Sequence, residues 1–136
     1  MKILILLSRN YLINSKQVFR NYVGIVGLES SANYLLNFGI KNIYEKNQYL
    51  SNILREELSN IPNITLYGPD DPNKRTSIVS FNIKGFDSQE IVDKLEKQNI
   101  ILAVREIMEK KIVRISPHFY NNEPQILQVI DAIKKL

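Results

Sequence analysis

The segment with the clearest capacity for chemistry is Val-Arg-Ile-Ser-Pro-His-Phe-Tyr-Asn at residues 113–121. A guanidinium matches a carboxylate with two parallel hydrogen bonds, so Arg114 is a candidate carboxylate-binding residue. The segment on its own favours a different interpretation, a surface arginine of a strand paired with a glutamate. His118 is the one histidine of the chain. Because it lies between Pro117 and Phe119, it is predicted to be a packed residue rather than a catalyst.

The absence of cysteine and the placement of the remaining polar residues exclude several kinds of chemistry. The chain has no cysteine, which excludes a disulfide framework, a thiolate metal site and a cysteine nucleophile, and with one histidine it is not expected to hold a structural zinc ion. Asp70 and Asp71 belong to a turn sequence without a partner for acid–base or metal chemistry. The tyrosines at positions 34, 44 and 49 predict packing, and the five glycines match neither the dinucleotide nor the phosphate-loop pattern. We therefore predict no catalytic residue and no metal ligand.

Charge and hydropathy limit the expected partners and location. The chain has 18 basic and 14 acidic residues, and its lysines alternate with glutamates along the predicted helices. A nucleic-acid footprint needs clustered basic residues, so nucleic acid is not an expected partner. The apolar run at residues 3–7 is too short for a signal peptide, and no stretch approaches the ~20 apolar residues of a membrane span. We expect no membrane partner and a cytoplasmic location.

Periodicity predicts the elements that position these residues. Residues 22–38 form a helix that is apolar on more than one face and rich in small residues, which indicates burial against another surface, and Gly39 supplies a left-handed cap. Residues 41–60 form a second, amphipathic helix. The remaining predicted elements are strands at residues 64–67, 76–83, 100–104 and 111–116, a helix opened by a capping box at Asp87 and Glu90, and a last helix capped by Asn121 or Asn122.

This order of elements predicts an α+β fold, in which helices pack on one face of a small, mostly antiparallel sheet that follows a long helical segment. Alternation within residues 79–83 places the three apolar side chains on one face and Ser80 and Asn82 on the other. Arg114 alternates in the same way with its apolar neighbours, so it lies opposite the core. We expect an N-terminal extension at residues 1–21 and one domain at residues 22–136.

Several short segments, in matching order and spacing, resemble the class V aminotransferases, a pyridoxal phosphate family that includes the cysteine desulfurases. Residues 113–121, followed by Glu123 and an amphipathic helix, resemble the C-terminal signature of the family. The resemblance covers residues 22–136 and implies the small, C-terminal domain of these enzymes. The segments that resemble the passage from the large into the small domain, and the strand after it, are residues 23–28, 39–40, 66–69 and 78–82.

The resemblance implies that Arg114 binds the α-carboxylate of the substrate. It also implies what this chain lacks. The Schiff-base lysine of the family lies in the large domain, the phosphate-contacting threonine has no counterpart at residues 19–22, and the cysteine of the desulfurases is missing from the predicted loop at residues 105–110. The family uses pyridoxal phosphate, but we expect this chain alone to bind no cofactor and to carry out no persulfide chemistry.

Three functions are compatible with these features. The first is a truncated or split class V enzyme that is inactive alone, and the second is one half of an enzyme whose large domain is a separate chain. The third is a stand-alone binding or interaction domain that reuses the fold. The apolar helix at residues 22–38 predicts a homodimer or a higher even oligomer, with Gly24, Gly27 and Ser31 allowing close approach at a two-fold interface.

Overall fold

The computed structural model describes residues 21–136. The chain divides into two compact units, Met1–Asn37 and Phe38–Leu136, and the described part of the first unit is helical. The predicted extension at residues 1–21 lies outside the described residues except for Asn21, so its boundary stays a prediction. None of the described helices is long and apolar enough to cross a membrane.

Helix α2 (Tyr22–Phe38) has the predicted bounds. Asn21 caps its first turn, because its Oδ1 accepts a hydrogen bond from the backbone N–H of Gly24 at 2.8 Å. Within the described part of the chain, no residue of α2 is buried, and Val23 is 84% exposed. The sequence predicts that α2 packs against another surface, and the described residues do not provide that surface. The predicted burial of α2 therefore remains a prediction.

Gly39 separates α2 from the next helix. Its φ of +94° is positive, as expected for a glycine at a helix end, but its ψ of 118° lies outside the left-handed helical region. The predicted left-handed cap is therefore only partly correct. The last turn of α2 is satisfied instead by Asn42, whose Nδ2 donates to the carbonyl oxygen of Phe38 at 2.9 Å.

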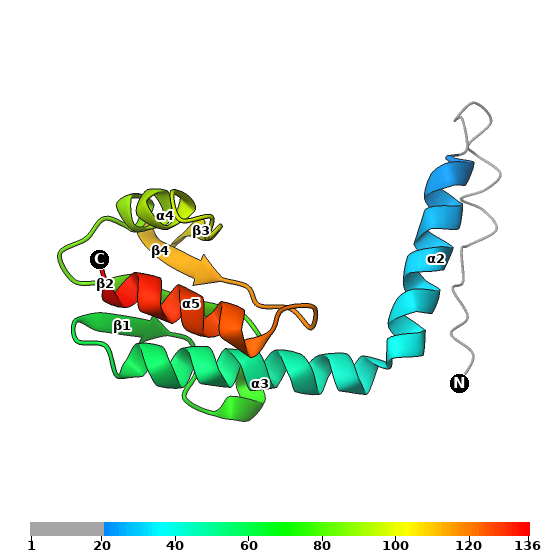
Figure 1. Ribbon diagram of the computed structural model, residues 1–136, viewed down its shortest axis with the longest axis horizontal. Coiled ribbons are helices and arrows are strands. Elements are labelled where there is room, and N and C mark those ends of the chain that lie inside the picture. The colour runs from blue at the N-terminus through cyan, green and yellow to red at the C-terminus, as the bar shows by residue number, and fades with distance from the viewer. Residues whose placement is uncertain (1–20) are drawn as a thin grey trace. The chain divides into compact units, whose positions relative to one another are not determined.

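The second unit contains three further α-helices, four strands and a short 3-10 helix (Figure 1). Apart from the 3-10 helix, their order is the one predicted from the sequence. In chain order they are α3 (Ile40–Ser59), β1 (Ile64–Tyr67), η1 (Pro72–Lys74), β2 (Val79–Ile83), α4 (Ser88–Glu96), β3 (Ala103–Ile107), β4 (Lys110–Ile115) and α5 (Glu123–Lys134).

The four strands form one antiparallel sheet in the order β1-β2-β4-β3. The central strands β2 and β4 pair Phe81 with Val113 and Ser80 with Arg114. Since successive side chains of a strand point to opposite faces, the first pair lies on one face and the second pair on the other. The predicted α+β fold and its antiparallel sheet are confirmed.

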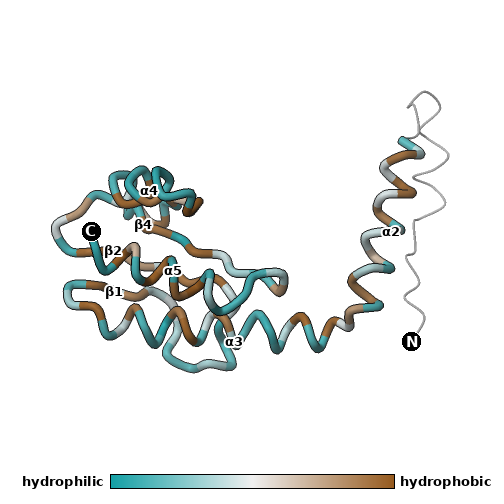
Figure 2. The backbone as a smooth tube through the Cα atoms, viewed as in Figure 1, coloured by the Kyte–Doolittle hydropathy of each residue, from teal (hydrophilic) through white to brown (hydrophobic). Residues whose placement is uncertain are grey.

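One face of the sheet carries the core. Phe81 and Val113 are fully buried there, and apolar side chains of all three helices join them in a single cluster, so α3, α4 and α5 cover the same face. Figure 2 shows these apolar positions recurring between polar ones along α3 and α5. Each fully buried side chain of this kind contributes ~1.5–3 kcal/mol. The helix residues of the cluster include Leu50, Leu54 and Leu58 of α3, Ile91 and Leu95 of α4, and Ile126, Ile130 and Ile133 of α5.

The opposite face of the sheet is not covered by any helix of the second unit. We refer to it as the uncovered face. Its residues include Tyr67 on β1, Ser80 and Asn82 on β2, and Ile112 and Arg114 on β4.

Capping residues begin the two later helices. Asp87 accepts hydrogen bonds from two backbone N–H groups in the first turn of α4, as predicted. The Glu90 carboxylate does not complete the predicted capping box but pairs with Lys94 at 2.8 Å. A complete capping box opens α5, where Asn122 and Gln125 each accept from the backbone N–H of the other.

Two predicted strand boundaries are wrong because local turns use the backbone groups that a strand would pair. β2 begins at Val79 rather than at residue 76, since the Oγ1 of Thr76 accepts from the N–H of Ile78 at 3.2 Å and forms a turn. β3 begins at Ala103 rather than at residue 100, since the N–H of Ile100 bonds the carbonyl oxygen at the end of α4 at 3.0 Å.

The predicted loop at residues 105–110 is also wrong, because these residues form a tight β-hairpin. Residues 105–107 pair with residues 110–112 across β3 and β4. Met108 and Glu109 form the two-residue turn with φ angles of 49° and 64°, the positive values that such a hairpin turn requires. The segment where desulfurases are expected to carry a loop cysteine is therefore a regular part of the sheet.

Candidate functional site

Arg114 lies near the C-terminal end of β4, on the uncovered face. Its neighbours in the sheet are Ser80 on β2 and Ala103 on β3, each directly opposite it in register. Both neighbours are small, so they leave space beside the long arginine side chain. The predicted position of Arg114, opposite the apolar Val113 and Ile115, is confirmed.

The hydrogen bonding of Arg114 is incomplete. The arginine is half-buried, and its Nε is buried without an acceptor among residues 21–136. The ion pairs within this part of the chain do not include Arg114, so the surface pair with a glutamate that its sequence segment favours is absent there. A buried donor without a partner costs ~1–3 kcal/mol, which an added acceptor would recover.

His118 lies in the connection between β4 and α5 among aromatic rings. Its ring stacks on Tyr120 with 4.8 Å between centroids and lies 4.9 Å from the ring of Phe119. Its Nδ1 is buried and has no hydrogen-bond partner in the described part of the chain. These ring contacts confirm the packed environment predicted for this histidine.

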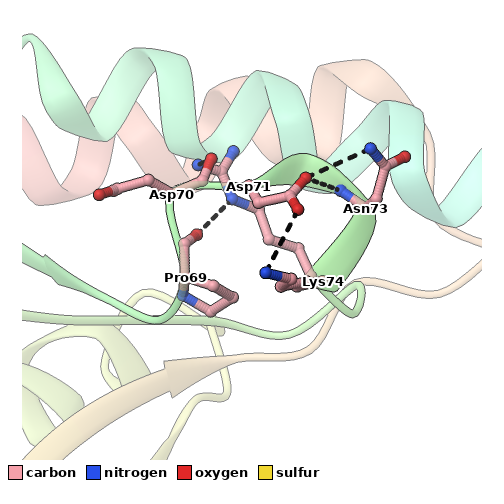
Figure 3. A network of polar contacts seen from close by, with 6 residues as sticks. Pro69, Asp70, Asp71, Asn73 and Lys74 are labelled. Atoms are coloured by element: carbon pink, nitrogen blue, oxygen red, sulfur yellow. Dashed lines mark hydrogen bonds and ion pairs between the residues drawn. The ribbon is translucent and has the colours of Figure 1, made fainter.

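The Asp71 carboxylate fixes the conformation of the β1–β2 connection (Figure 3). Asp71 accepts hydrogen bonds from the backbone N–H of Asn73 at 3.0 Å and from its Nδ2 at 3.2 Å, and pairs with Lys74 at 3.7 Å. It therefore caps η1, in agreement with the predicted turn. The described residues contain no group of three or more histidines or carboxylates placed to hold a metal ion.

Sequence reasoning missed a pair of arginines at the same connection. The Nε of Arg75 donates to the carbonyl oxygen of Pro69 at 2.7 Å and another guanidinium nitrogen donates to that of Asp70, while Nη1 of Arg55 donates to the carbonyl oxygen of Tyr67 at 3.3 Å. Burial, followed by the nearby charge of Arg75, lowers the pKa of Arg55, and Asp70 opposes this shift. The available sequence signal was the position of Arg75, which follows closely after the predicted turn at residues 68–73.

The described residues do not fit pyridoxal phosphate by themselves. A Schiff-base lysine is activated when it is desolvated, but no lysine within residues 21–136 is buried. Lys46 and Lys94 are the most sheltered, and they lie over the rings of Tyr49 and Phe86 at 5.4 and 4.9 Å. Among the described residues, Arg114 is thus a candidate to bind an anion, and no lysine lies in the desolvated environment that activates a Schiff-base lysine.

Comparison with known sequences connects this chain to one family. The class V aminotransferase family model matches residues 15–129. A cysteine desulfurase of Wigglesworthia glossinidia brevipalpis is 30% identical over 125 residues, which cover 85% of this chain and 30% of that protein. A cysteine desulfurase of Escherichia coli O127:H6 is 33% identical over 85 residues, which cover 62% of this chain and 20% of that protein. The chain thus spans less than a third of the length of these relatives.

Solved structures show the same fold. The cysteine desulfurase CsdA of Escherichia coli superposes with a TM-score of 0.78 at 17% identity, over 88% of this chain and 31% of that one. The apo cysteine desulfurase of Thermococcus onnurineus NA1 gives 0.75 at 21% identity, over 81% of this chain and 30% of that one. A C-DES mutant with glycine covalently linked to its PLP cofactor gives 0.60 at 24% identity, over 71% and 24%. The predicted cofactor of the family is confirmed by that complex.

Proposed function

Because this chain belongs to the class V aminotransferase family, we propose that it supplies the substrate-orienting small domain of a pyridoxal phosphate enzyme. In this proposal Arg114 binds the α-carboxylate of an amino-acid substrate. The cofactor and its lysine come from a large domain, either in the same polypeptide or in a separate chain. Residues 1–136 alone then have no aminotransferase or lyase activity.

The observation that carries this proposal is the incomplete hydrogen bonding of Arg114. Its Nε has no acceptor in the described chain, and the residues opposite it, Ser80 and Ala103, are small. A carboxylate offers two oxygens in one plane, which match the guanidinium fork and would supply the missing acceptor. An oriented carboxylate holds the rest of the substrate in one position relative to the cofactor-bearing domain.

A fusion protein tests the role of Arg114. Residues 22–136 are joined to the large domain of a class V relative, and the KM and kcat for its amino acid are measured. Arg114→Ala is expected to raise KM about tenfold or more, because a charge-assisted pair is lost. Arg105→Ala is the matched control, since Arg105 lies on the same face and its Nη1 bonds only the adjacent carbonyl oxygen of Val104 at 3.2 Å. An active fusion that is indifferent to Arg114→Ala would reject the assignment.

The cofactor part of the proposal is tested on the chain itself. The purified protein is mixed with pyridoxal phosphate, reduced with borohydride and analysed by peptide mass spectrometry. We expect low, scattered labelling of exposed lysines, because no described lysine is buried. Stoichiometric labelling of one lysine, lost when that lysine is replaced, would show that the chain binds the cofactor without a large domain.

A second candidate, a stand-alone interaction domain that forms a homodimer or a higher even oligomer, is favoured by helix α2. Its apolar side chains are exposed, with Val23, Leu28 and Ile25 at 84, 68 and 58%. Covering such a helix would contribute ~25 cal/mol per Å² of apolar surface. We propose a two-fold contact along the side of α2 that carries Gly24, Gly27 and Ser31.

Light scattering at micromolar concentration tests this candidate. Gly27→Glu is expected to give a monomer, and nothing lies within 4 Å of a Cβ placed at Gly27, so the helix itself accepts a side chain there. Asn33→Glu adds the same charge on the opposite side of the helix and should leave the oligomer intact. A monomeric parent protein, or an oligomer that tolerates Gly27→Glu, would contradict the proposed interface.

A further inference from the structure

The uncovered face contains a cavity that the proposed function does not use. It has a volume of about 320 Å³ and lies between the β1–β2 connection and the β3–β4 hairpin. This volume is within the range of small-molecule sites. Its charged lining residues are Arg55, Lys74 and Arg75, and its apolar lining residues include Ile78, Ile107 and Ile112.

The two arginines of the cavity are held in place by neutral acceptors. Arg75 donates to the carbonyl oxygens of Pro69, at 2.7 Å, and of Asp70, and Arg55 donates to that of Tyr67 at 3.3 Å. Backbone carbonyls position a guanidinium without cancelling its charge. Each guanidinium has more N–H groups than these bonds use, so donors remain for a ligand. A site that is ordered before binding loses less entropy when the ligand arrives.

The positive charge of the cavity is poorly neutralised. Within residues 21–136, neither Arg55 nor Arg75 has a carboxylate oxygen within 4.0 Å. The pKa of Arg55 is lowered by burial and then by the charge of Arg75, and Asp70 opposes this effect. Lys74 has a partner in Asp71 at 3.7 Å, but both side chains are exposed and such pairs are weak. An anion between the two guanidinium groups would relieve their repulsion.

The rest of the lining suits an apolar group. Ile112 is 4% exposed although no helix of the second unit covers its face of the sheet, whereas Ile107 and Ile78 are 55 and 41% exposed. These three side chains come from β4, from the hairpin and from the segment before β2. Together they offer an aliphatic surface beside the arginines, the usual combination of an apolar pocket and a few placed polar groups.

We propose that this cavity binds a small ligand with an oxyanion head, a carboxylate or a phosphate monoester, and a short aliphatic tail. The head lies between Arg55 and Arg75, and the tail lies on Ile78, Ile107 and Ile112. Arg114 does not line this cavity. Ser80, which lies directly opposite Arg114 in register, does line it, so the cavity adjoins the carboxylate site proposed for Arg114 but uses different charged residues.

Isothermal titration of the 136-residue chain at constant ionic strength tests the site. Butyrate and butyl phosphate carry the two possible heads, acetate and inorganic phosphate lack the tail, and butylamine lacks the negative charge. We expect saturable binding at one site for butyrate or butyl phosphate, weaker binding for the matching head alone, and none for butylamine. The tighter of the two tailed ligands identifies the head group. No saturable binding of either tailed ligand would overturn the proposal.

Variants locate the binding. Arg55→Gln is expected to weaken binding about tenfold or more, because a charged donor is lost. Arg105→Gln removes the same charge elsewhere on the uncovered face, at a residue that does not line the cavity, and should leave the affinity unchanged. An equal loss in both variants would show general attraction to positive charge and would overturn the site.

A second readout does not depend on these substitutions. In methyl NMR spectra of the unsubstituted chain, butyrate or butyl phosphate should shift the signals of Ile107 and Ile112 with the dissociation constant found by titration. The signals of core residues such as Ile130, which is 1% exposed, should move little. Saturable binding that leaves the Ile107 and Ile112 methyl signals unchanged would place the ligand elsewhere.

Discussion

The two faces of the sheet differ although their residues alternate along the same strands. On β2, Phe81 is fully buried under the helices, and its neighbour Ser80 lies on the uncovered face. On β4, Val113 is fully buried, and its neighbour Arg114 is half-buried with an Nε that lacks an acceptor in the described chain. Among the described residues, the covered face thus packs into one apolar cluster, whereas the uncovered face carries a buried donor without an acceptor, the Arg114 Nε.

This difference suggests that the covered face provides the stability of the fold and that the uncovered face is available for binding. The covered face excludes water from one apolar cluster, and any polar group there would need a partner inside the chain. The uncovered face has no such requirement, so it accommodates Arg114 at one end of β4 and the cavity with Arg55 and Arg75 at the side. Substitutions on the covered face should therefore unfold the chain, and substitutions on the uncovered face should mainly change what it binds.

The largest effect is expected for Phe81→Ala. It removes a fully buried ring at the centre of the sheet and should lower the free energy of unfolding by about 3–5 kcal/mol. Ser80→Ala, one residue away on the uncovered face, should change it by less than about 0.5 kcal/mol. Urea denaturation followed by circular dichroism measures both. Similar losses of unfolding free energy in the two variants would show that the two faces do not differ in their contribution to stability.

A smaller effect is expected for Asn82→Ala at the edge of the uncovered face. Its Nδ2 donates to the carbonyl oxygen of Lys111 at 2.9 Å, and its Oδ1 accepts from the buried hydroxyl of Ser88 at 3.2 Å. That hydroxyl keeps its own bond to Lys111 at 2.9 Å, so the loss should be about 0.5–1.5 kcal/mol. The same denaturation experiment applies. A loss as large as that of Phe81→Ala would mean that the uncovered face also carries core stability.

Arg114→Ala is expected to cost still less, under about 1 kcal/mol, because the side chain makes no ion pair within the described chain and one of its donors is unsatisfied. The thermal midpoint of the free chain should hardly change. In the fusion with a large domain, the same substitution should abolish most substrate affinity. A free-chain loss above about 2 kcal/mol would instead give Arg114 a structural role.

The smallest effect is expected on the outer surface of the helices, remote from both faces. Glu123 raises the pKa of Tyr49 by accepting its hydroxyl hydrogen bond at 2.5 Å and by its negative charge. The pKa of the folded state then exceeds that of the unfolded chain, about 10. The associated stability is present below that pH and is lost as pH rises through the folded-state pKa. NMR titration of labelled tyrosine rings should show that the pKa of Tyr49 is lower in Glu123→Gln than in the unsubstituted chain. An unchanged pKa of Tyr49 would exclude its hydrogen bond with Glu123.

Local pattern predicted much of this fold correctly. The helix bounds of α2, the strand bounds of β1 and the faces of β2 all follow from short-range periodicity and from capping residues that act within one turn. The family resemblance led to Arg114, and the sheet places it opposite the core as expected. These features depend on residues that are close together in the sequence, so a local sequence pattern is enough to predict them.

The features that sequence analysis missed depend on contacts between distant residues. The hairpin at Met108 and Glu109 contains no glycine, so only the pairing of β3 with β4 reveals it. Arg55 and Arg75 are twenty residues apart and meet because α3 and the β1–β2 connection pack side by side.

By itself, the sequence determined the alternating pattern that assigns each strand residue to a face, because that pattern is local. Only the tertiary structure decided which charges on the uncovered face find partners. Whether Arg114, Arg55 and Arg75 meet a carboxylate depends on the distances between side chains from different elements, and those distances exist only once the helices have closed over the opposite face.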